Sequence, residues 1–378
     1  MKIGIVCYPT FGGSGIVATE LGKALADKEH EVHFVAYRQP VRLNDQVNNI
    51  VFHEVRVADY PLFEYPPYEL SLACKLLDVV KYEKLDLLHV HYAIPHAYVA
   101  YLTKQMLAEE GIHIPVVTTL HGTDITLVGK SPALTPAVNF SINHSNVVTA
   151  VSQHLREETL NCFSIRKEIK VIPNFIDFDL HNYTFDQDLQ IHYAPNREKI
   201  MIHISNFRPV KRVADVIRIF VNVREKMPTK LLMVGDGPQR DVAEYLCRDL
   251  DCSDDVKFLG KTKDVSRLLA ISDLFVLPSE KESFGLVALE AMAAGIPVVS
   301  SNIGGLSQVN INGVTGYTSG VGDVAKMSND AISLLSDKAK YNEFSQNALL
   351  AAKEYDICEI LPLYEAVYLE ALETIKQF

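Results

Sequence analysis

Short apolar runs recur along the chain, and each is followed by a turn and a longer amphipathic or loop stretch. The first series of runs covers residues 3–7, 32–35, 85–90, 116–120 and 147–151. A second series covers residues 200–204, 230–234, 256–259, 274–277 and 298–300. Amphipathic stretches such as 213–225 and 242–250 lie between the runs. This alternation predicts an α/β protein with parallel sheets that carry helices on both faces.

Two successive series of strands predict two doubly wound, Rossmann-like domains, which suits a chain of 378 residues. We expect the first domain to span residues 1–173 and the second residues 174–359, with the break near Pro173. An amphipathic helix at about 360–378 is expected to complete the first domain. Ligands of such sheets bind at the carboxyl ends of the strands, so the residues that follow the strands are the functional candidates.

Composition and charge narrow the class of protein. Hydrophobic residues make up 48% and charged residues 22%, which is typical of a soluble globular protein with no stable membrane association. The net charge of −11 disfavours a nucleic-acid partner. The six cysteines form no Cys-x-x-Cys pair, which is typical of a reducing cytoplasm. The first apolar run leads straight into a turn, so we interpret it as a buried strand and not as a signal peptide.

A glycine-rich loop, Gly12-Gly13-Ser14-Gly15, follows the first strand and precedes a helix expected from about Ile16. Glycines there allow close approach to a ligand, and the helix directs free N–H groups to the same place. The alternative is a plain strand-to-helix turn. The spacing does not match G-x-G-x-x-G, and no acidic residue ends the second strand, so a nicotinamide cofactor is disfavoured.

Histidines follow two further strands. His89, His91 and His96 invite a zinc hypothesis, but no carboxylate pattern or cysteine pair completes a site. The other interpretation packs one histidine in the core while Tyr92 or His96 faces a cleft. His121 ends the next strand and is placed to form a hydrogen bond in that cleft. Its polar neighbours are either part of the cleft or a network that caps the loop, and they are Thr119, Thr123 and Asp124.

Basic residues follow the first strand of the second domain. Arg208 is suited to a bidentate contact with a diphosphate and Lys211 to a point-charge contact. A solvated basic turn is the alternative, and the position after a strand favours the binding role. A tight turn at Gly235 follows the next strand. It either lines the nucleotide or has the purely structural role of reversing the chain.

The segment from Glu282 to Glu290 carries the most chemical information. It predicts a loop, a helix N-terminus and a buried small-residue helix face, with Glu290 about two turns inside the helix. The N–H groups of Phe284, Gly285 and Leu286 would bind phosphate. Glu290 could accept both hydroxyls of a ribose, and Glu282 those of a sugar ring.

This segment resembles the signature of retaining glycosyltransferase family 4, and the turn at Lys211 resembles that family's diphosphate-binding turn. The order of motifs is similar from residue 1 to about 375. The resemblance implies a GT-B fold, in which two Rossmann-like domains enclose the active site in the cleft between them. It also implies that no metal or cofactor is required beyond the nucleotide-sugar substrate.

Within the family, KIGIVCYPTFGGSG, TTLHGTDIT and SNFRPVKR are similar to members that move N-acetylglucosamine from UDP-GlcNAc to the hydroxyl of L-malate, the first step of bacillithiol biosynthesis. That similarity implies a cytoplasmic homodimer. It also implies that Lys211 and Arg208 hold the diphosphate, Glu290 the ribose, and Glu282 and His121 the transferred sugar. Further donor contacts are expected at Gly13, Ser14, Gly15, Asn206, Gly235, Ser283, Phe284, Gly285 and Leu286. Acceptor contacts are expected at Ser14, Arg42, Tyr92, Thr119, Thr123 and Asn206.

Two departures from the family pattern concern the donor side. Ser205-Asn206 stands where relatives commonly carry Gly-Arg, and Ser307-Gln308 stands where they carry Pro-Glu. Either Arg208 replaces the missing arginine, or Asn206 serves the carboxylate side of malate. No carboxylate is placed as a nucleophile, so we expect front-face substitution with retention. Two alternatives remain: a family 4 enzyme with a lipid or polysaccharide acceptor, and a non-catalytic UDP-sugar-binding protein.

Overall fold

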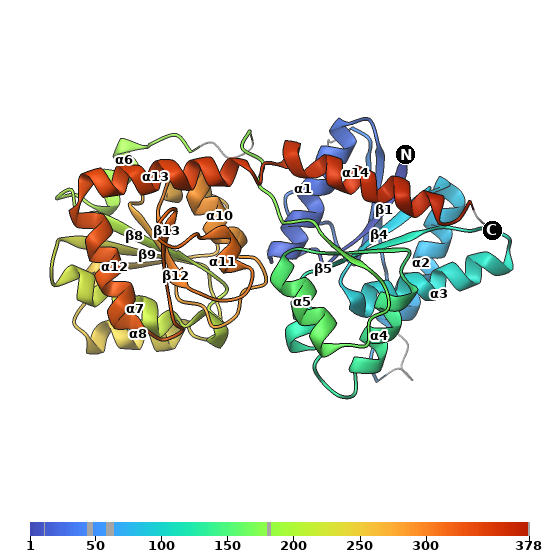
Figure 1. The fold of residues 1–378 in the computed structure, drawn as a ribbon, viewed down its shortest axis with the longest axis horizontal. Helices are drawn as coiled ribbons and strands as arrows, with labels where there is room; N and C mark the ends of the chain where they lie inside the picture. The colour runs from blue at the N-terminus through green and yellow to red at the C-terminus, as the bar shows by residue number, and fades with distance from the viewer. Residues whose placement is uncertain (11, 44–47, 58–63, 180–182, 377–378) are drawn as a thin grey trace. The chain divides into compact units, whose positions relative to one another are not determined.

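The computed structural model describes residues 1–10, 12–43, 48–57, 64–179 and 183–376. The chain divides into two compact units, which we call the first unit (Met1–Phe175 with Ile357–Phe378) and the second unit (Ile176–Asp356). The second unit is therefore one continuous segment, whereas the first is built from both ends of the chain. The C-terminal helix α14 (Ile357–Glu373), red in Figure 1, packs on α1 (Gly13–Asp27) in the first unit.

The first unit contains a sheet of seven parallel strands in the order β3-β2-β1-β4-β5-β6-β7. The strands are β1 Lys2–Val6, β2 Glu31–Ala36, β3 Ile50–Glu54, β4 Leu87–His91, β5 Val116–Leu120, β6 Val147–Ala150 and β7 Ile169–Val171. The helices α2 (Tyr68–Glu83) and α3 (Tyr98–Glu109) bury one apolar face of this sheet. The other helices are α4 Thr135–His144 and α5 Gln153–Cys162, with short helical turns at Ala93–Ala97 and Thr123–Leu127.

The second unit contains a sheet of six parallel strands in the order β10-β9-β8-β11-β12-β13. The strands are β8 Lys199–Ile204, β9 Thr229–Val234, β10 Val256–Gly260, β11 Leu274–Leu277, β12 Val298–Ser301 and β13 Gly316–Ser319. Helices surround it at α6 Gln187–Tyr193, α7 Val213–Arg224, α8 Arg240–Asp249, α9 Val265–Ala270, α10 Leu286–Ala293, α11 Leu306–Val309, α12 Val324–Ser336 and α13 Lys338–Lys353. Short 3-10 turns lie at Pro209–Lys211 and Ser253–Asp255.

Each sheet reverses its strand order at one place. In the first unit this topological switch point lies between β1 and β4, and in the second unit between β8 and β11. Loops that leave the two strands at a switch point diverge, which leaves room for a ligand at the carboxyl edge. The loops that follow these four strands are therefore the candidates for a functional site.

All ten predicted strands are present, so the two series are confirmed. Three further strands, β3, β7 and β13, were not predicted, and each lies at the edge of its sheet. Edge strands are only partly covered, so they lack a continuous apolar run. In the part of the chain that the structure describes, no helix is long and apolar enough to cross a membrane.

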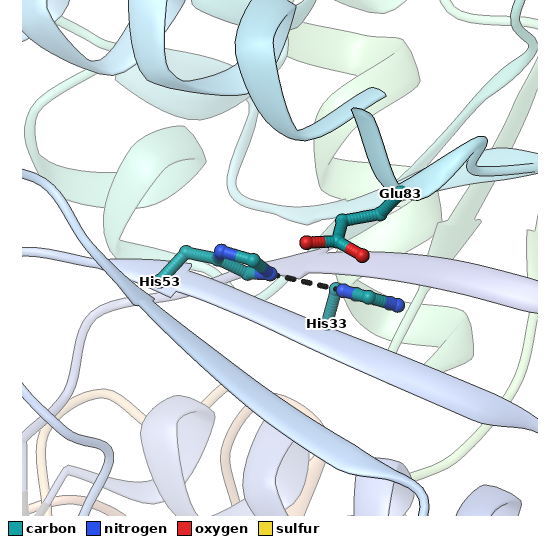
Figure 2. Close-up of side chains that lie close together, drawn as sticks. All are labelled: His33, His53 and Glu83. Carbon is teal, nitrogen blue, oxygen red and sulfur yellow. Dashed lines mark hydrogen bonds between the residues drawn. The ribbon is translucent and has the colours of Figure 1, made fainter. Parts of the chain in front are cut away.

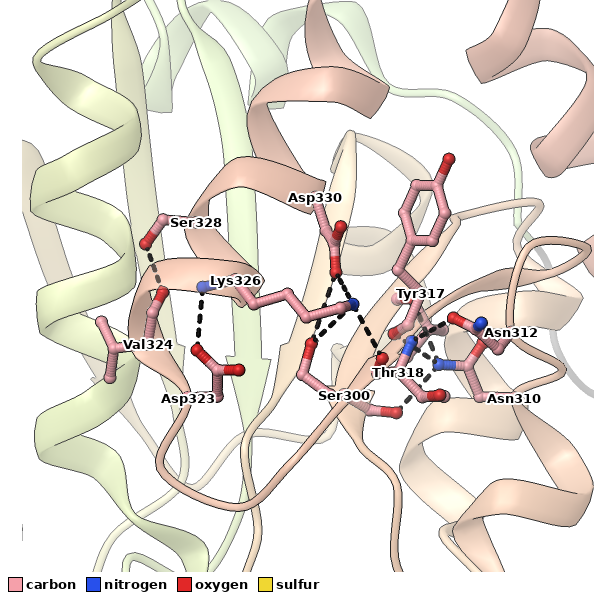
Figure 3. Close-up of polar contacts among 12 residues, drawn as sticks. Ser300, Asn310, Asn312, Tyr317, Thr318, Asp323, Val324, Lys326, Ser328 and Asp330 are labelled. Atoms are coloured by element: carbon pink, nitrogen blue, oxygen red, sulfur yellow. Dashed lines mark hydrogen bonds and ion pairs between the residues drawn. The ribbon is translucent and has the colours of Figure 1, made fainter.

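Polar side chains hold the edge strand β13 in place (Figure 3). The buried Asn310 amide donates to Ser300 Oγ at 2.8 Å, and Asn312 Oδ1 accepts from Thr318 N at 2.9 Å. On α12, Lys326 Nζ donates to Thr318 O at 3.0 Å and pairs with Asp330 at 2.7 Å. These hydrogen bonds replace the apolar pattern that would have revealed the strand in the sequence.

Candidate functional site

Two loops meet at the switch point of the second unit. Lys211, at the end of the 3-10 turn after β8, lies with Nζ 2.5 Å from Oε1 of Glu282, in the loop after β11. Ser279 Oγ donates to the same carboxylate oxygen at 2.9 Å. The backbone ties the loops together as well, since Glu280 N donates to Val210 O at 2.7 Å. The two residues that the sequence singled out on separate loops therefore form one polar centre.

The pair of Lys211 and Glu282 is only partly covered, with side chains that are 18% and 11% exposed. An ammonium group in this position can exchange a carboxylate for a phosphate oxygen, because both are anionic acceptors. The carboxylate that it releases can then accept hydrogen bonds from sugar hydroxyls. Sequence reasoning assigned no role to Ser279, whose signal is its position two residues after the strand β11.

Glycines let the backbones of neighbouring loops touch at this edge. A Cβ on Gly235 would lie 1.8 Å from Ser205 O, and φ of +115° favours glycine there as well. A Cβ on Gly304 would lie 2.0 Å from Glu282 O, and one on Gly305 would lie 2.1 Å from Ser283 O. Packing alone thus explains Gly235, while Gly304 and Gly305 hold the loop that carries Glu282.

Helix α10 begins at Leu286, after Gly285 in the left-handed conformation with φ of 95°. The first internal helix bonds run from Ala288 N and Leu289 N to Gly285 O, so Leu286 belongs to the open N-terminus. Glu290 lies about one turn inside the helix. The sequence predicted two turns, and the difference arises because the helix starts later than expected. It is buried, as its small neighbours indicated.

Phe284 lies before the helix and packs its ring against Tyr355 at 5.7 Å between centroids. Its side chain is buried, so its contribution is to the core beneath the loop. Ser283 is half-buried in the same loop. The backbone N–H of Phe284 lies directly before the N-cap Gly285, so a phosphate contact from Phe284, Gly285 and Leu286 stays a prediction.

The departure at Ser205-Asn206 has a local structural reason. Buried His203 donates from Nδ1 to Val276 O at 2.8 Å, and its Nε2 accepts from Ser205 Oγ at 2.8 Å. Burial lowers the pKa of His203 to about 4, so this imidazole is neutral near pH 7. Asn206 and Arg208 are exposed in the turn that follows.

At the second departure, Ser307-Gln308, Ser307 Oγ donates to Gly304 O at 2.9 Å and Gln308 is exposed.

The switch point of the first unit also joins two loops. Ser14 Oγ, at the start of α1, lies 2.5 Å from the hydroxyl of Tyr92, which follows β4. Gly15 is required by packing, since a Cβ there would lie 2.5 Å from Tyr8 O. Helix α1 begins at Gly13, three residues earlier than expected, and Gly13 is exposed.

A buried row of imidazoles lies behind these loops. His91 Nδ1 is 2.8 Å from His121 Nε2, and the two rings stack at 5.0 Å. Both nitrogens of His89 are engaged, Nδ1 by Tyr368 OH at 2.8 Å and Nε2 by Thr119 Oγ1 at 2.7 Å. Burial lowers the pKa of His89 and of His121 to about 3. These imidazoles are neutral hydrogen-bonding groups near pH 7, and His89 has no nitrogen left for a metal.

Thr119 is not placed to touch a substrate. It lies inside β5, it is fully buried, and its hydroxyl contacts Thr149 Oγ1 at 2.7 Å in addition to His89. This position corrects the expectation that Thr119 binds the acceptor. Thr123 is exposed in the loop after β5. Arg42 is part-exposed, 3.9 Å from the Glu20 carboxylate on α1.

Asp124 caps the loops after β4 and β5. Its carboxylate accepts from Ala93 N at 2.7 Å and from Gly122 N at 3.0 Å. Burial raises the pKa of Asp124 to about 6, although these backbone N–H groups oppose the rise. The interpretation of this segment as a capping network therefore holds for Asp124, which positions the backbone beside Tyr92 and His121.

Two family models match the chain. The one described as Glycosyltransferase Family 4 matches residues 11–180, and the one described as Glycosyl transferases group 1 matches residues 184–350. The chain is 48% identical to the N-acetyl-alpha-D-glucosaminyl L-malate synthase of Bacillus anthracis over 378 residues, which covers 100% of the chain and 98% of that protein. It is 30% identical over 339 residues to an uncharacterized glycosyltransferase of Methanocaldococcus jannaschii, covering 84% and 85%.

Solved structures resemble the fold. Anabaena HepE in complex with UDP and glucose matches with a TM-score of 0.82 and 22% identity, over 97% of this chain and 99% of that one. Sucrose-phosphate synthase from Thermosynechococcus elongatus matches with a TM-score of 0.80 and 18% identity, over 99% of both chains. At these identities the similarity concerns the fold.

Proposed function

Because the chain belongs to glycosyltransferase family 4 and has its GT-B fold, we propose that it transfers N-acetylglucosamine from UDP-GlcNAc to the hydroxyl of L-malate. The observation that carries the proposal is the pair of Lys211 and Glu282 at the switch point of the second unit. The 48% identity to a synthase of that name supports the choice of acceptor. The reaction is the first step of bacillithiol biosynthesis.

The donor is assigned to the second unit. Lys211 and Arg208 neutralise the diphosphate, together with the N-terminus of α10 at Gly285 and Leu286. Glu282 accepts hydrogen bonds from the sugar hydroxyls once Lys211 turns to phosphate. Glu290 accepts the ribose hydroxyls from its place one turn inside α10. Asn206 and Ser283 contribute polar groups beside these residues.

The acceptor is assigned to the first unit. Ser14 and Tyr92 form a hydrogen-bonded pair of hydroxyl groups 2.5 Å apart, and the proton that the pair does not use between its members can be donated to a carboxylate. Thr123 adds a third hydroxyl, and Arg42 adds the cation that a dianion such as malate needs. His121, a neutral imidazole, donates to the transferred sugar. Gly13 lets the loop backbone approach the substrates closely.

The chemistry that follows is front-face substitution with retention at the anomeric carbon. The bond from the anomeric carbon to the diphosphate oxygen breaks as the malate hydroxyl adds on the same face. The departing diphosphate oxygen takes the proton of that hydroxyl. The protein contributes orientation and stabilisation of the negative charge that develops on the diphosphate, mainly from Lys211.

A UDP-release assay with UDP-GlcNAc and a panel of acceptors tests the proposal. Wild-type protein should release UDP with L-malate and not with glycerol, and NMR of the product should show the α-anomer. Lys211→Ala should lower kcat about 100-fold to 1,000-fold, the loss expected for one electrostatic donor. Lys281→Ala is the matched control, because it removes an exposed lysine one residue from Glu282.

Four outcomes would contradict the proposal. Equal rates with malate and glycerol would reject an acceptor site that recognises carboxylates. Turnover only with lipid or polysaccharide acceptors would assign a different substrate class, and binding of UDP-GlcNAc without UDP release would indicate a sensor protein. Equal effects of Lys211→Ala and Lys281→Ala would remove Lys211 from the diphosphate site.

We further infer a cytoplasmic homodimer that needs no metal for transfer, as the family resemblance implies. Activity after treatment with a chelator tests whether transfer needs a metal. Light scattering on the purified chain tests the oligomeric state, and a mass of one chain would contradict it. Cell fractionation tests the location.

A further inference from the structure

Two histidines and a glutamate gather at the edge of the first unit, outside the loops at its switch point. They are His33 on β2, His53 on the edge strand β3 and Glu83 at the end of α2 (Figure 2). His33 Nδ1 lies 2.9 Å from His53 Nε2, and one ligand atom from each of the three residues lies within 4.8 Å of the others. His33 is fully buried, whereas the other two are half-buried.

The strand register brings the two imidazoles to one face. His33 pairs laterally with Val51, and Val35 pairs with His53, so both rings stand on the face that α2 covers. Three separate elements therefore each deliver one group to the same point. Figure 2 shows the Glu83 carboxylate beside the two rings.

A second carboxylate orients His33 from behind. His33 Nε2 lies 3.0 Å from Glu31 Oε1, and Lys2 Nζ lies 2.9 Å from that same oxygen. Lys2 and Glu31 thus form an ion pair, and the Glu31 carboxylate is the acceptor that faces His33. His33 then donates its Nε2–H to Glu31 and presents a lone pair on Nδ1. A carboxylate that holds the far nitrogen of a histidine is the usual support of a metal-ligating imidazole.

We propose that His33 Nδ1, His53 Nε2 and the Glu83 carboxylate bind a divalent transition-metal ion of the zinc class. Two nitrogens and one oxygen suit that class, and a water molecule can complete a tetrahedral site. Metal–nitrogen bonds of about 2.0–2.1 Å place two tetrahedral ligand nitrogens about 3.3 Å apart. The imidazoles need to separate by only a few tenths of an ångström from 2.9 Å.

The role of this site is structural. The metal would join the edge strand β3 and the end of α2 to β2, and none of its ligands belongs to the loops that carry the proposed transfer chemistry. A ligand that binds the folded chain and not the unfolded chain raises its stability. The site is independent of the proposed function, so each can fail without the other.

The experiment is a titration of chelator-treated, full-length protein with Zn²⁺ by calorimetry and with Co²⁺ by visible absorption. One site is expected, with a tetrahedral cobalt spectrum and a rise in Tm on addition of Zn²⁺. His53→Gln and Glu83→Gln should abolish this site. Glu31→Gln should weaken it about 10-fold to 100-fold, the usual effect of losing the carboxylate behind a ligating histidine.

His154→Gln is the matched control, because His154 is an exposed histidine that pairs with Glu158 at 3.6 Å. That variant should bind the metal as the wild type does. Equal affinity in His53→Gln, or no binding by the wild type, would overturn the proposal. So would a cobalt spectrum with thiolate bands, since Cys74, Cys162 and Cys358 are exposed. Circular dichroism checks that each variant is folded.

Discussion

The buried imidazoles of the first unit predict that this unit loses stability steeply in mild acid. Burial lowers the pKa of His89 and His121 to about 3, that of His96 to about 4, and that of His91 well below its ordinary value. In the unfolded chain each would titrate near 6.5. A lowered histidine pKa destabilises the fold as the pH falls below the unfolded value, because only the unfolded chain then takes up the proton.

The magnitude follows from these values. Between pH 6.5 and pH 5 each of the three histidines His89, His96 and His121 costs about 1.6 kcal/mol of unfolding free energy, and His91 acts in the same direction. Asp124 acts in the opposite direction, because its pKa is raised to about 6 and it gains a proton in the folded state first. The protonation of Asp124 offsets about 1 kcal/mol of the unfolding free energy that the histidines cost. The net loss from these groups, about 4 kcal/mol without His91, approaches the whole stability of a marginally stable domain.

Urea unfolding at a series of pH values between 7.5 and 5 measures this loss. Hydrogen exchange of peptides from the two units, corrected for the pH dependence of intrinsic exchange, reports each unit separately. The second unit is an internal comparison, since His203, with a pKa of about 4, is the buried imidazole beside its switch point. The first unit should lose stability at least about twice as steeply.

Variants isolate the contribution of one imidazole. His89→Gln keeps polar atoms near Tyr368 and Thr119 but removes one titrating group, so the pH slope should fall by about 1.4 kcal/mol per pH unit. His154→Gln removes a half-exposed histidine and should leave the slope unchanged. An unchanged slope in His89→Gln, or equal slopes in the two units, would refute the reasoning.

Three further predictions concern single residues. Gly305→Ala would place a Cβ 2.1 Å from Ser283 O, so we expect a raised KM for UDP-GlcNAc in steady-state kinetics with a normal circular dichroism spectrum. The pKa of Asp124, raised to about 6, makes the wild type lose stability as the pH rises through that value. Asp124→Asn does not titrate, so between pH 5.5 and 7.5 its free energy of unfolding should rise by about 1 kcal/mol relative to that of the wild type. Urea unfolding at the two pH values measures the difference. Asn310→Ala leaves buried polar groups without their donor and should cost the second unit about 2 kcal/mol by urea unfolding, whereas exposed Asn342→Ala should cost little.

The central strands could be predicted because helices cover both faces and demand continuous apolar runs. The edge strand β13 could not, since its place depends on side chains outside the strand, Asn310 before it and Lys326 after it. A similar limit applies to the switch point of the second unit. That Lys211 and Glu282 approach each other follows from strand order, but their direct pairing is visible only in three dimensions.

Thr119 shows where reasoning from strand ends fails. It stands next to the last residue of β5, so the sequence placed it at the cleft. Its side chain instead points to a face that α14 covers, where Tyr368 contacts His89. A helix from the far end of the chain decides that burial, and no local pattern around Thr119 reports it.

The return of α14 to the first unit has a consequence for biosynthesis. Tyr364 and Tyr368 are fully buried against His89 on β4, yet the ribosome makes them after the whole second unit. The second unit is continuous and can fold as it emerges, in keeping with the tendency of domains to fold as units during synthesis. The first unit begins synthesis first and completes its core last, so the strands β4, β5 and β6 of the nascent chain stay partly uncovered until α14 has been made.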